Sequence, residues 1–283
     1  MEKLIAIDNE AYMIPAIFSY AEKSERMPAI ILCHGTGSQK NEVGNLFVEM
    51  SKRLLNIGIA SIRLDYAGCG DSKACQTELN FCGEVNDTKK VYQYLCAQDF
   101  IDCSSIGILG FSQGARVMAE LLKDMPSIRL AISWSGACHN GMGVFKGWFD
   151  EYYQEASERG YARIPLFWRE DLLLSKKWFD DIRDTTPMAG VQMYEGPVLA
   201  VAGDKDELVP YYHAKEIVEN SRNNNSKAVI VQSSNHTFNV LMPDDSKADD
   251  VIEITIQWIK KILMTDRKSD LQIQICRTEK VEA

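Results

Sequence analysis

The sequence lacks any hydrophobic run long enough to cross a membrane, and its first residues do not form a signal peptide. Hydrophobic residues make up 46% of the 283 positions, but no apolar run approaches the roughly 20 residues of a spanning helix. Met1 to Ala6 lead into acidic and polar side chains before an apolar segment of roughly 7 to 15 residues can form. We therefore expect a cytoplasmic protein with no membrane partner.

The sequence also lacks an excess of positive charge. Lysine and arginine number 31 against 40 acidic residues, which gives a formal net charge of -9 and a pI near 5.1. A chain of this charge is repelled by nucleic-acid phosphates and by anionic lipid surfaces. We therefore expect no nucleic-acid partner.

The eight cysteines include no CxxC pair and no cysteine–histidine pair at the spacing of a zinc site. Because the cytoplasm keeps thiols reduced, we expect free thiols, although Cys69, Cys75 and Cys82 are close enough in sequence to bridge on oxidation. We expect neither a bound metal nor a cofactor. The cysteines stand at positions 33, 69, 75, 82, 96, 103, 138 and 276.

Short apolar runs alternate with helical patterns from Ala29 onward, which is typical of βαβ units and a parallel sheet. The runs are continuously apolar, as expected for strands that helices cover on both faces. Helical periodicity is clear over 84–98 and 251–263. The sequence predicts an α/β fold with one mostly parallel sheet of eight strands, at residues 4–7, 12–19, 29–33, 59–64, 105–109, 130–134, 198–202 and 228–231.

Residues 137–194 interrupt this alternation, because they show helical patterns and no convincing strand. We expect a core of residues 1–136 and 195–264, and an inserted helical cap that covers the site with an apolar wall. The alternative is a packing layer with no role in ligand binding. The aromatic residues that suggest the wall include Phe145, Trp148, Phe149, Tyr152, Tyr153, Phe167, Trp168 and Trp178.

The last segment, 265–283, is predicted to be a tail. Residues 271–276 alternate with period two, which is consistent with an extra strand or with pairing to a second subunit; a disordered tail is an equal alternative, and the sequence does not decide between them. A homodimer and a monomer both stay open.

The strongest chemical signal is the pentapeptide Gly110-Phe111-Ser112-Gln113-Gly114, between the predicted strand 105–109 and an amphipathic helix that Pro126 ends. A sharp turn from strand to helix strains the backbone of the serine, requires small flanking residues and holds the hydroxyl clear of the sheet. We predict that Ser112 is a nucleophile.

A serine hydroxyl needs a neighbouring imidazole to accept its proton. After a serine in such a turn, the acid and then the histidine follow along the chain, which excludes His34 and His139. His213 lies within a predicted helix, where it reads as a surface or packing residue. His236 follows the last predicted strand, at the sheet edge where loops carry function. We predict that His236 is the base.

The carboxylate that pairs with His236 should follow the predicted strand 198–202. Asp206 fits a Gly-x-x-Asp-x-x-Val-Pro pattern there, and we predict that it is the acid. Its function would be to fix the imidazole tautomer and to stabilise the imidazolium. Asp204 is the competitor, which reads as a brace of the turn.

An oxyanion intermediate needs two N–H donors. The residue after the nucleophile supplies one, here the Gln113 N–H, and the glycine-rich loop His34-Gly35-Thr36-Gly37 supplies the other, which we assign to the Thr36 N–H. His34 reads as a structural hydrogen-bonding residue beneath this loop. The glycine-rich turn from Arg63 to Ser72 is interpreted as architectural.

The motifs H-G-T-G, D-Y-x-G-x-G-D-S, G-F-S-Q-G, G-D-K-D and N-H-T-F resemble those of the α/β-hydrolase superfamily over about residues 1–264. More narrowly, His34-Gly35 with Gly37 and Asn41-Glu42, Ser112-Gln113-Gly114 and a compact insertion resemble bacterial cinnamoyl and feruloyl esterases. This resemblance implies an α/β-hydrolase fold and a serine esterase of hydroxycinnamate esters. Many members carry Phe where Thr36 stands and Gly where Ala115 stands.

Three functions stay open. The favoured one is a carboxylesterase that hydrolyses small or aromatic esters through an acyl-enzyme. A peptidase, amidase or thioesterase would use the same three residues, although an oligopeptidase usually carries a large extra domain that 283 residues cannot hold. The third is a catalytically idle binding protein.

Overall fold

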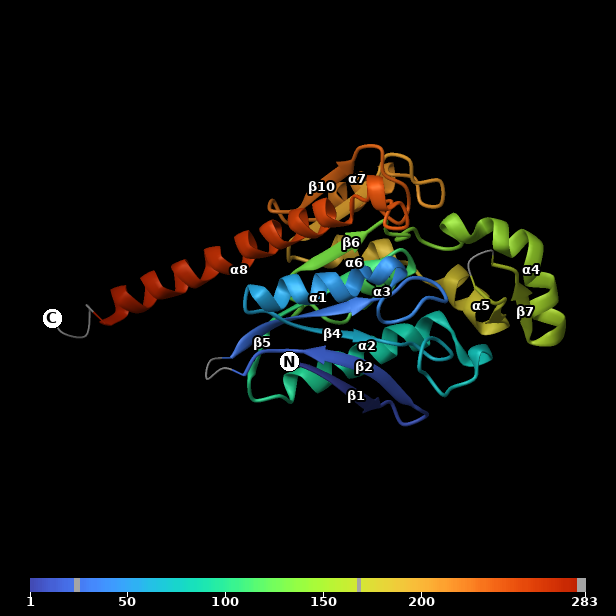
Figure 1. The fold of residues 1–283 in the computed structure, drawn as a ribbon, viewed down its shortest axis with the longest axis horizontal. Coiled ribbons are helices and arrows are strands. Elements are labelled where there is room, and N and C mark those ends of the chain that lie inside the picture. The colour runs from blue at the N-terminus through green and yellow to red at the C-terminus, as the bar shows by residue number, and fades with distance from the viewer. Residues whose placement is uncertain (23–25, 167–168, 279–283) are drawn as a thin grey trace.

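A computed structural model describes residues 1–22, 26–166 and 169–278, and for residues 264–278 it describes the backbone alone. A single sheet of eight strands crosses the molecule in the order β1-β2-β4-β3-β5-β6-β9-β10 (Figure 1). These strands are β1 (Glu2–Asp8), β2 (Met13–Ser19), β3 (Met27–Cys33), β4 (Ala60–Leu64), β5 (Ile101–Phe111), β6 (Ala131–Trp134), β9 (Val198–Gly203) and β10 (Lys227–Val231).

The predicted sheet is confirmed, strand by strand. β2 pairs antiparallel with β1 and with β4, and every pairing from β4 to β10 is parallel. The helices are α1 (Leu46–Asn56), α2 (Phe81–Cys96), α3 (Gln113–Leu121), α4 (Lys146–Arg159), α5 (Lys176–Asp184), α6 (Pro187–Met193), α7 (Tyr212–Glu219) and α8 (Ala248–Thr278).

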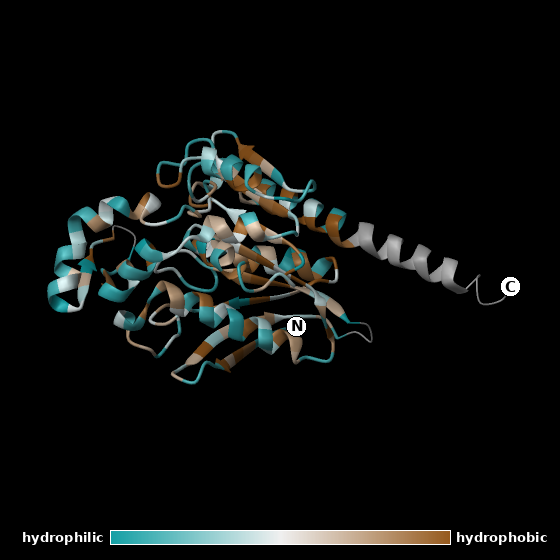
Figure 2. Cartoon of the chain, turned by 180° about the vertical axis from the view of Figure 1, so that it is seen from behind, coloured by the Kyte–Doolittle hydropathy of each residue, from teal (hydrophilic) through white to brown (hydrophobic). Residues whose placement is uncertain are grey.

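The helices cover both faces of the sheet. In β3, Ile30 and Leu32 face a core that α1 and α8 close, while Ile31 and Cys33 face a second core that α2, α3, α6 and α7 close. This alternation follows from the two-residue period of a strand. Figure 2 shows hydrophobic residues along strands of the sheet and a mixture of hydrophilic and hydrophobic residues along the helices.

The insertion contains two strands, so the prediction that it has none is wrong. β7 (Tyr161–Ile164) pairs antiparallel with β8 (Leu172–Ser175). Each strand has four residues, which is too short for a two-residue period to stand out from a helical one. In Figure 1 this pair lies with α4 and α5 at the end of the molecule opposite the projecting end of α8.

The extra strand, one of the alternatives left open for 271–276, is not formed, because α8 continues through these residues as far as Thr278 (Figure 1). A helix satisfies its backbone N–H and C=O groups internally, whereas a strand here would need a partner strand. Within the described residues, no helix combines the length and the apolar character required to cross a bilayer.

Cys96 and Cys103 form a disulfide, which corrects the expectation that all thiols are free. α2 ends at Cys96 and β5 begins at Ile101, so the tight connection brings the two Cα atoms to 4.9 Å, within the range of a disulfide. The cysteines suggested to bridge on oxidation are free, Cys69 being buried and Cys75 and Cys82 exposed.

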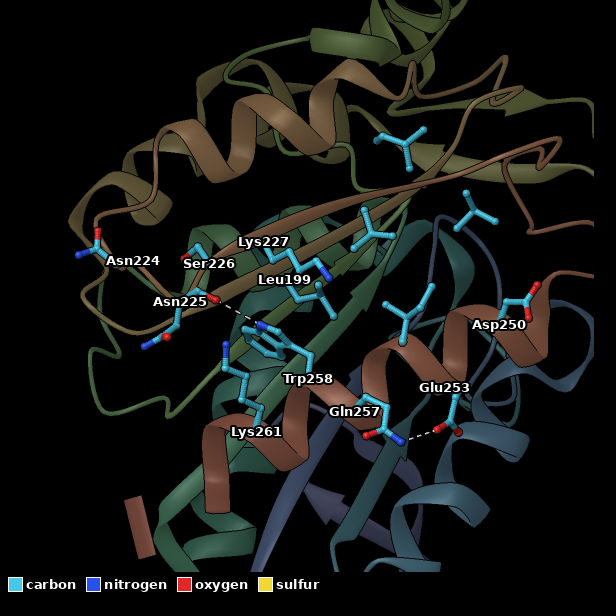
Figure 3. A pocket seen from close by; sticks show the side chains of 14 residues that line it. Leu199, Asn224, Asn225, Ser226, Lys227, Asp250, Glu253, Gln257, Trp258 and Lys261 are labelled. Carbon is cyan, nitrogen blue, oxygen red and sulfur yellow. Dashed lines mark hydrogen bonds between the residues drawn. The ribbon is translucent and has the colours of Figure 1, made fainter. Parts of the chain in front are cut away.

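A pocket of about 760 Å³ lies between β10 and α8, at the edge of the sheet (Figure 3). The Trp258 Nε1–H donates to the Asn225 carbonyl across it, at 3.2 Å. Ser112 and His236 do not line this pocket. The size of this pocket therefore does not identify the candidate functional site. The side chains at the other end of the strands identify it instead.

Candidate active site

Ser112 stands in the turn between β5 and α3 with a left-handed backbone, φ 54° and ψ −117°. This conformation is costly for a residue other than glycine. The neighbours explain why the flanking positions are glycines: a Cβ on Gly110 would lie 2.2 Å from the backbone of Gly114, and one on Gly114 would lie 1.9 Å from the Cys33 carbonyl oxygen. The packing therefore requires the G-x-S-x-G pattern for steric reasons.

The structure brings Ser112, His236 and Asp206 into one hydrogen-bonded chain. The Ser112 hydroxyl lies 3.1 Å from His236 Nε2, and His236 Nδ1 lies 2.8 Å from Asp206 Oδ2. The Asp206 side chain is fully buried and the His236 ring is 13% exposed. This arrangement lets an imidazole take the hydroxyl proton while a carboxylate holds its other nitrogen.

Backbone and side-chain contacts fix the two partners of Ser112. Asp206 Oδ1 accepts the N–H groups of Leu208 and Val209 at 2.9 and 2.8 Å, so its other oxygen is turned to the imidazole. The Ser135 hydroxyl donates to the His236 carbonyl at 2.9 Å. Asp204 instead accepts the N–H of Ser234, at 3.2 Å, and does not contact the imidazole.

Thr36 and Gln113, the two predicted oxyanion donors, are joined through their side chains. The Thr36 hydroxyl donates to Gln113 Oε1 at 2.6 Å. In the described part of the chain, the backbone N–H groups of both residues have no hydrogen-bond acceptor. Gly35, which precedes Thr36, lies close to Ser112, since a Cβ on Gly35 would be 3.3 Å from the Ser112 Cβ. Two backbone N–H groups near the serine are therefore available to a further acceptor.

Glu84, in α2, contacts Gln113 of this pair, and the sequence did not predict that contact. Gln113 Nε2 donates to Glu84 Oε2 at 2.5 Å. Burial raises the pKa of Glu84 to about 8, and the negative charge of Asp87 adds to the rise. Glu84 is thus mostly uncharged at neutral pH. An oxyanion next to Gln113 would therefore not be repelled by a negative charge on Glu84. An acidic residue within a helical pattern gave no signal of this burial.

Two buried carboxylates hold the loop that carries Thr36. Glu42 accepts the Gly35 N–H at 2.8 Å and the Ser38 hydroxyl at 2.6 Å. Asp65 accepts both the backbone N–H and the ammonium of Lys40, at 2.7 and 2.5 Å. The turn after β4 thus has the architectural function predicted for it.

His34 lies beneath the same loop and does not contact Ser112. Its Nε2 accepts the Tyr66 N–H at 3.3 Å, and its Nδ1 lies 2.8 Å from the Gly35 carbonyl. Burial lowers the pKa of His34, so the ring is neutral and suited to accept on one side and donate on the other. Both contacts agree with a structural role.

The insertion is tied to the loops around Ser112. Arg169 donates to the Gly37 carbonyl, and the Leu173 N–H donates to Gln76 at 2.7 Å. At its base, the buried guanidinium of Arg116, from α3, donates to four oxygens: those of His139, Gly141, Ile182 and the Thr185 hydroxyl. Burial lowers the pKa of Arg116 to about 10.

The aromatic residues of the insertion mainly pack against one another. Trp178 contacts Phe145 edge-on at 5.2 Å between ring centroids, and Phe149 contacts Phe179 edge-on at 5.1 Å. Trp178 and Phe179 are fully buried. This agrees with a packing layer, while Phe167 and Trp168 of the predicted wall lie outside the described residues.

A group of polar side chains at the start of the insertion was also missed. His139 Nε2 lies 2.8 Å from Glu216 Oε2, and the His139 and His213 rings are 3.7 Å apart between centroids. Burial lowers the pKa of His213 to about 4, with the nearby His139 as a further cause. His213 and Glu216 are three residues apart on α7, a spacing that places them on one face and could have signalled the pair.

Fold and site geometry together define the class: the chain is an α/β hydrolase. More narrowly, it belongs to the prolyl oligopeptidase family, whose family model matches residues 78–266. The matched range contains Ser112, Asp206 and His236 and excludes Thr36.

Solved structures of known esterases share the fold at low sequence identity. Est1E from Butyrivibrio proteoclasticus, with bound ferulic acid, is 20% identical with a TM-score of 0.71, covering 92% of this chain and 98% of its own. The esterase EaEST from Exiguobacterium antarcticum is 18% identical with a TM-score of 0.65, covering 90% and 98%. The esterase domain from a Rhodothermus marinus protein is 16% identical with a TM-score of 0.67, covering 92% and 98%. The comparison with curated proteins finds no match.

Proposed function

We propose that the chain is a serine carboxylesterase that hydrolyses small or aromatic carboxylic esters through an acyl-enzyme. The observation that carries this proposal is the hydrogen-bonded chain from the Ser112 hydroxyl through His236 to Asp206, at 3.1 and 2.8 Å. The esterases among the solved structures, one with ferulic acid bound, support the ester class and the inclusion of hydroxycinnamates.

In the first half-reaction, Ser112 Oγ attacks the ester carbonyl while His236 Nε2 takes the hydroxyl proton. Asp206 stabilises the imidazolium, and the N–H groups of Thr36 and Gln113 donate to the oxyanion. His236 then gives its proton to the leaving alcohol as the C–O bond breaks. Water, deprotonated by His236, attacks the acyl-enzyme and releases the acid and Ser112.

The insertion, residues 137–194, is proposed to cap this site and to limit the acyl group. The contacts of Arg169 with Gly37 and of Leu173 with Gln76 support this position over the loops that follow β3 and β4. We expect short or aryl acyl groups to be preferred over acyl chains of roughly 12 carbons or more, because a substrate pocket beneath a cap is enclosed and of limited volume.

The test is the hydrolysis of p-nitrophenyl butyrate without added metal, with labelling by a fluorophosphonate probe. Ser112→Ala and His236→Ala should lose both signals, since each removes a member of the reacting unit. Ser104→Ala is the control, because this exposed serine lies at the start of the same strand, β5. Full turnover in either of the first two variants rejects the proposal.

The family match supports one alternative, a peptidase or amidase with the same residues. Amide cleavage must protonate a poorer leaving group than ester cleavage does. A matched pair of an ester and an anilide with the same acyl group separates the two functions, and a thioester of that acid tests thioesterase activity. Faster turnover of the anilide would favour the peptidase.

A further inference from the structure

A second group of side chains lies apart from the Ser112 hydroxyl, between the loop after β6 and helix α7. Among the described residues, His139, His213 and Glu216 each offer a ligand atom, and the three atoms lie within 4.8 Å of one another. His139 Nε2 and Glu216 Oε2 are already 2.8 Å apart. The esterase mechanism uses none of the three.

Each of the two imidazoles in this group has one buried ring nitrogen without a partner among the described residues. His139 Nδ1 and His213 Nδ1 are both buried and have no hydrogen-bond partner among the described residues. His213 is only 7% exposed, and its ring lies 3.7 Å from that of His139. A buried polar atom without a hydrogen-bond partner is unfavourable, so two adjacent ones point to a ligand that binds them.

The ligand atoms are held on rigid supports. The backbone of His139 is fixed because its carbonyl accepts Arg116 Nη1 at 2.6 Å, and Arg116 is itself fully buried. His213 and Glu216 share one face of α7. The two supports therefore present their side chains to the same point without needing to refold.

We propose that His139, His213 and Glu216 form a binding site for a divalent cation of the zinc class. Two imidazoles and one carboxylate are a ligand set that zinc accepts, with a fourth position left for water or another ligand. Tetrahedral bonds of about 2.0–2.1 Å place ligand atoms roughly 3.4 Å apart, so small side-chain movements suffice. This proposal departs from the expectation, drawn from sequence, that the chain binds no metal.

The cation would join the start of the insertion to α7, which follows the turn of Asp206. It would bind the one available lone pair of each imidazole and an oxygen of Glu216. Metal binding to the folded state alone raises its stability in proportion to the logarithm of free metal. The site therefore acts on the joint between insertion and core.

The test is calorimetric titration of the chelator-treated full chain with ZnCl₂, followed by the visible spectrum of the Co²⁺ form. The background is Cys75→Ser with Cys82→Ser, because these exposed thiols would also bind zinc. We expect one zinc per chain, a micromolar or lower dissociation constant, and a tetrahedral Co²⁺ absorption.

Glu216→Gln and His213→Gln should each weaken zinc binding by at least about tenfold and remove the Co²⁺ absorption, since each deletes a ligand. Glu219→Gln is the matched control, an exposed carboxylate on the same helix, and should bind like the parent. Glu216 is partly exposed, so that variant separates loss of a ligand from loss of the fold. Stoichiometric binding that is equal in all variants, or no binding by the parent, overturns the proposal.

Discussion

Glu84→Gln should change the pH dependence of stability, because the variant keeps the acceptor for Gln113 but has no titrating proton. The ordinary pKa of a glutamate is 4.5, and burial raises that of Glu84 to about 8. Between these values the folded chain keeps a proton that the unfolded chain has released. The stability of the native protein therefore falls as pH rises through this window and levels off above it.

The magnitude follows from the two pKa values. The contribution of one such proton changes by about 1.4 kcal/mol per pH unit, which over the window from 4.5 to about 8 amounts to about 5 kcal/mol. Relative to the native chain, Glu84→Gln should thus gain stability steadily from pH 5 to pH 8. The gain should stop near pH 8.

Urea unfolding, followed by tryptophan fluorescence at pH 5, 6, 7, 8 and 9, measures this difference. Glu78→Gln is the control, since Glu78 is an exposed carboxylate just before α2. Its free energy of unfolding should differ from that of the native chain by the same small amount at every pH. If Glu84→Gln also shows a constant difference, within about 1 kcal/mol, then Glu84 is not a buried neutral acid and the reasoning is refuted.

Three further predictions test the site and its frame. Asp206→Asn should lower kcat for p-nitrophenyl butyrate by about 10⁴-fold with a small change in KM, because the imidazole would take the wrong tautomer; an unchanged kcat contradicts the assignment. Gly114→Ala should lose at least about 3 kcal/mol in thermal unfolding, since its Cβ would lie 1.9 Å from a carbonyl oxygen, whereas Gly147→Ala, with nothing within 4 Å, should gain up to about 1 kcal/mol. Reducing Cys96–Cys103, or replacing both by Ser, should cost about 2 kcal/mol in urea unfolding, and an equal midpoint in oxidised and reduced protein would count against the bridge.

The sheet could be predicted from sequence because each strand is a compact apolar run that helices cover on both sides. The positions of Ser112, Asp206 and His236 could be predicted for a related reason. Each follows a strand of the parallel sheet, and parallel strands end at the same edge. Proximity in space was thus implied by topology, although the three residues lie far apart along the chain.

Features that depend on side-chain packing could not be predicted in this way. Glu84 occupies a helical position whose burial is decided by contact with Gln113, from another element. The pairing of Cys96 with Cys103 depends on how tightly α2 turns into β5, and β7 and β8 are too short to leave a period. The contact of His139 with Glu216 of α7 depends on the conformation of the loop after β6.

The buried guanidinium of Arg116 joins the two ends of the insertion to each other and to α3. Its acceptors belong to both roots of the insertion, His139 and Gly141 on one side and Ile182 and Thr185 on the other. Moving these two segments away from Arg116 would leave its buried guanidinium without acceptors, at a cost of several kcal/mol. One side chain of α3 thus fastens both ends of the insertion to the same helix that begins directly after Ser112.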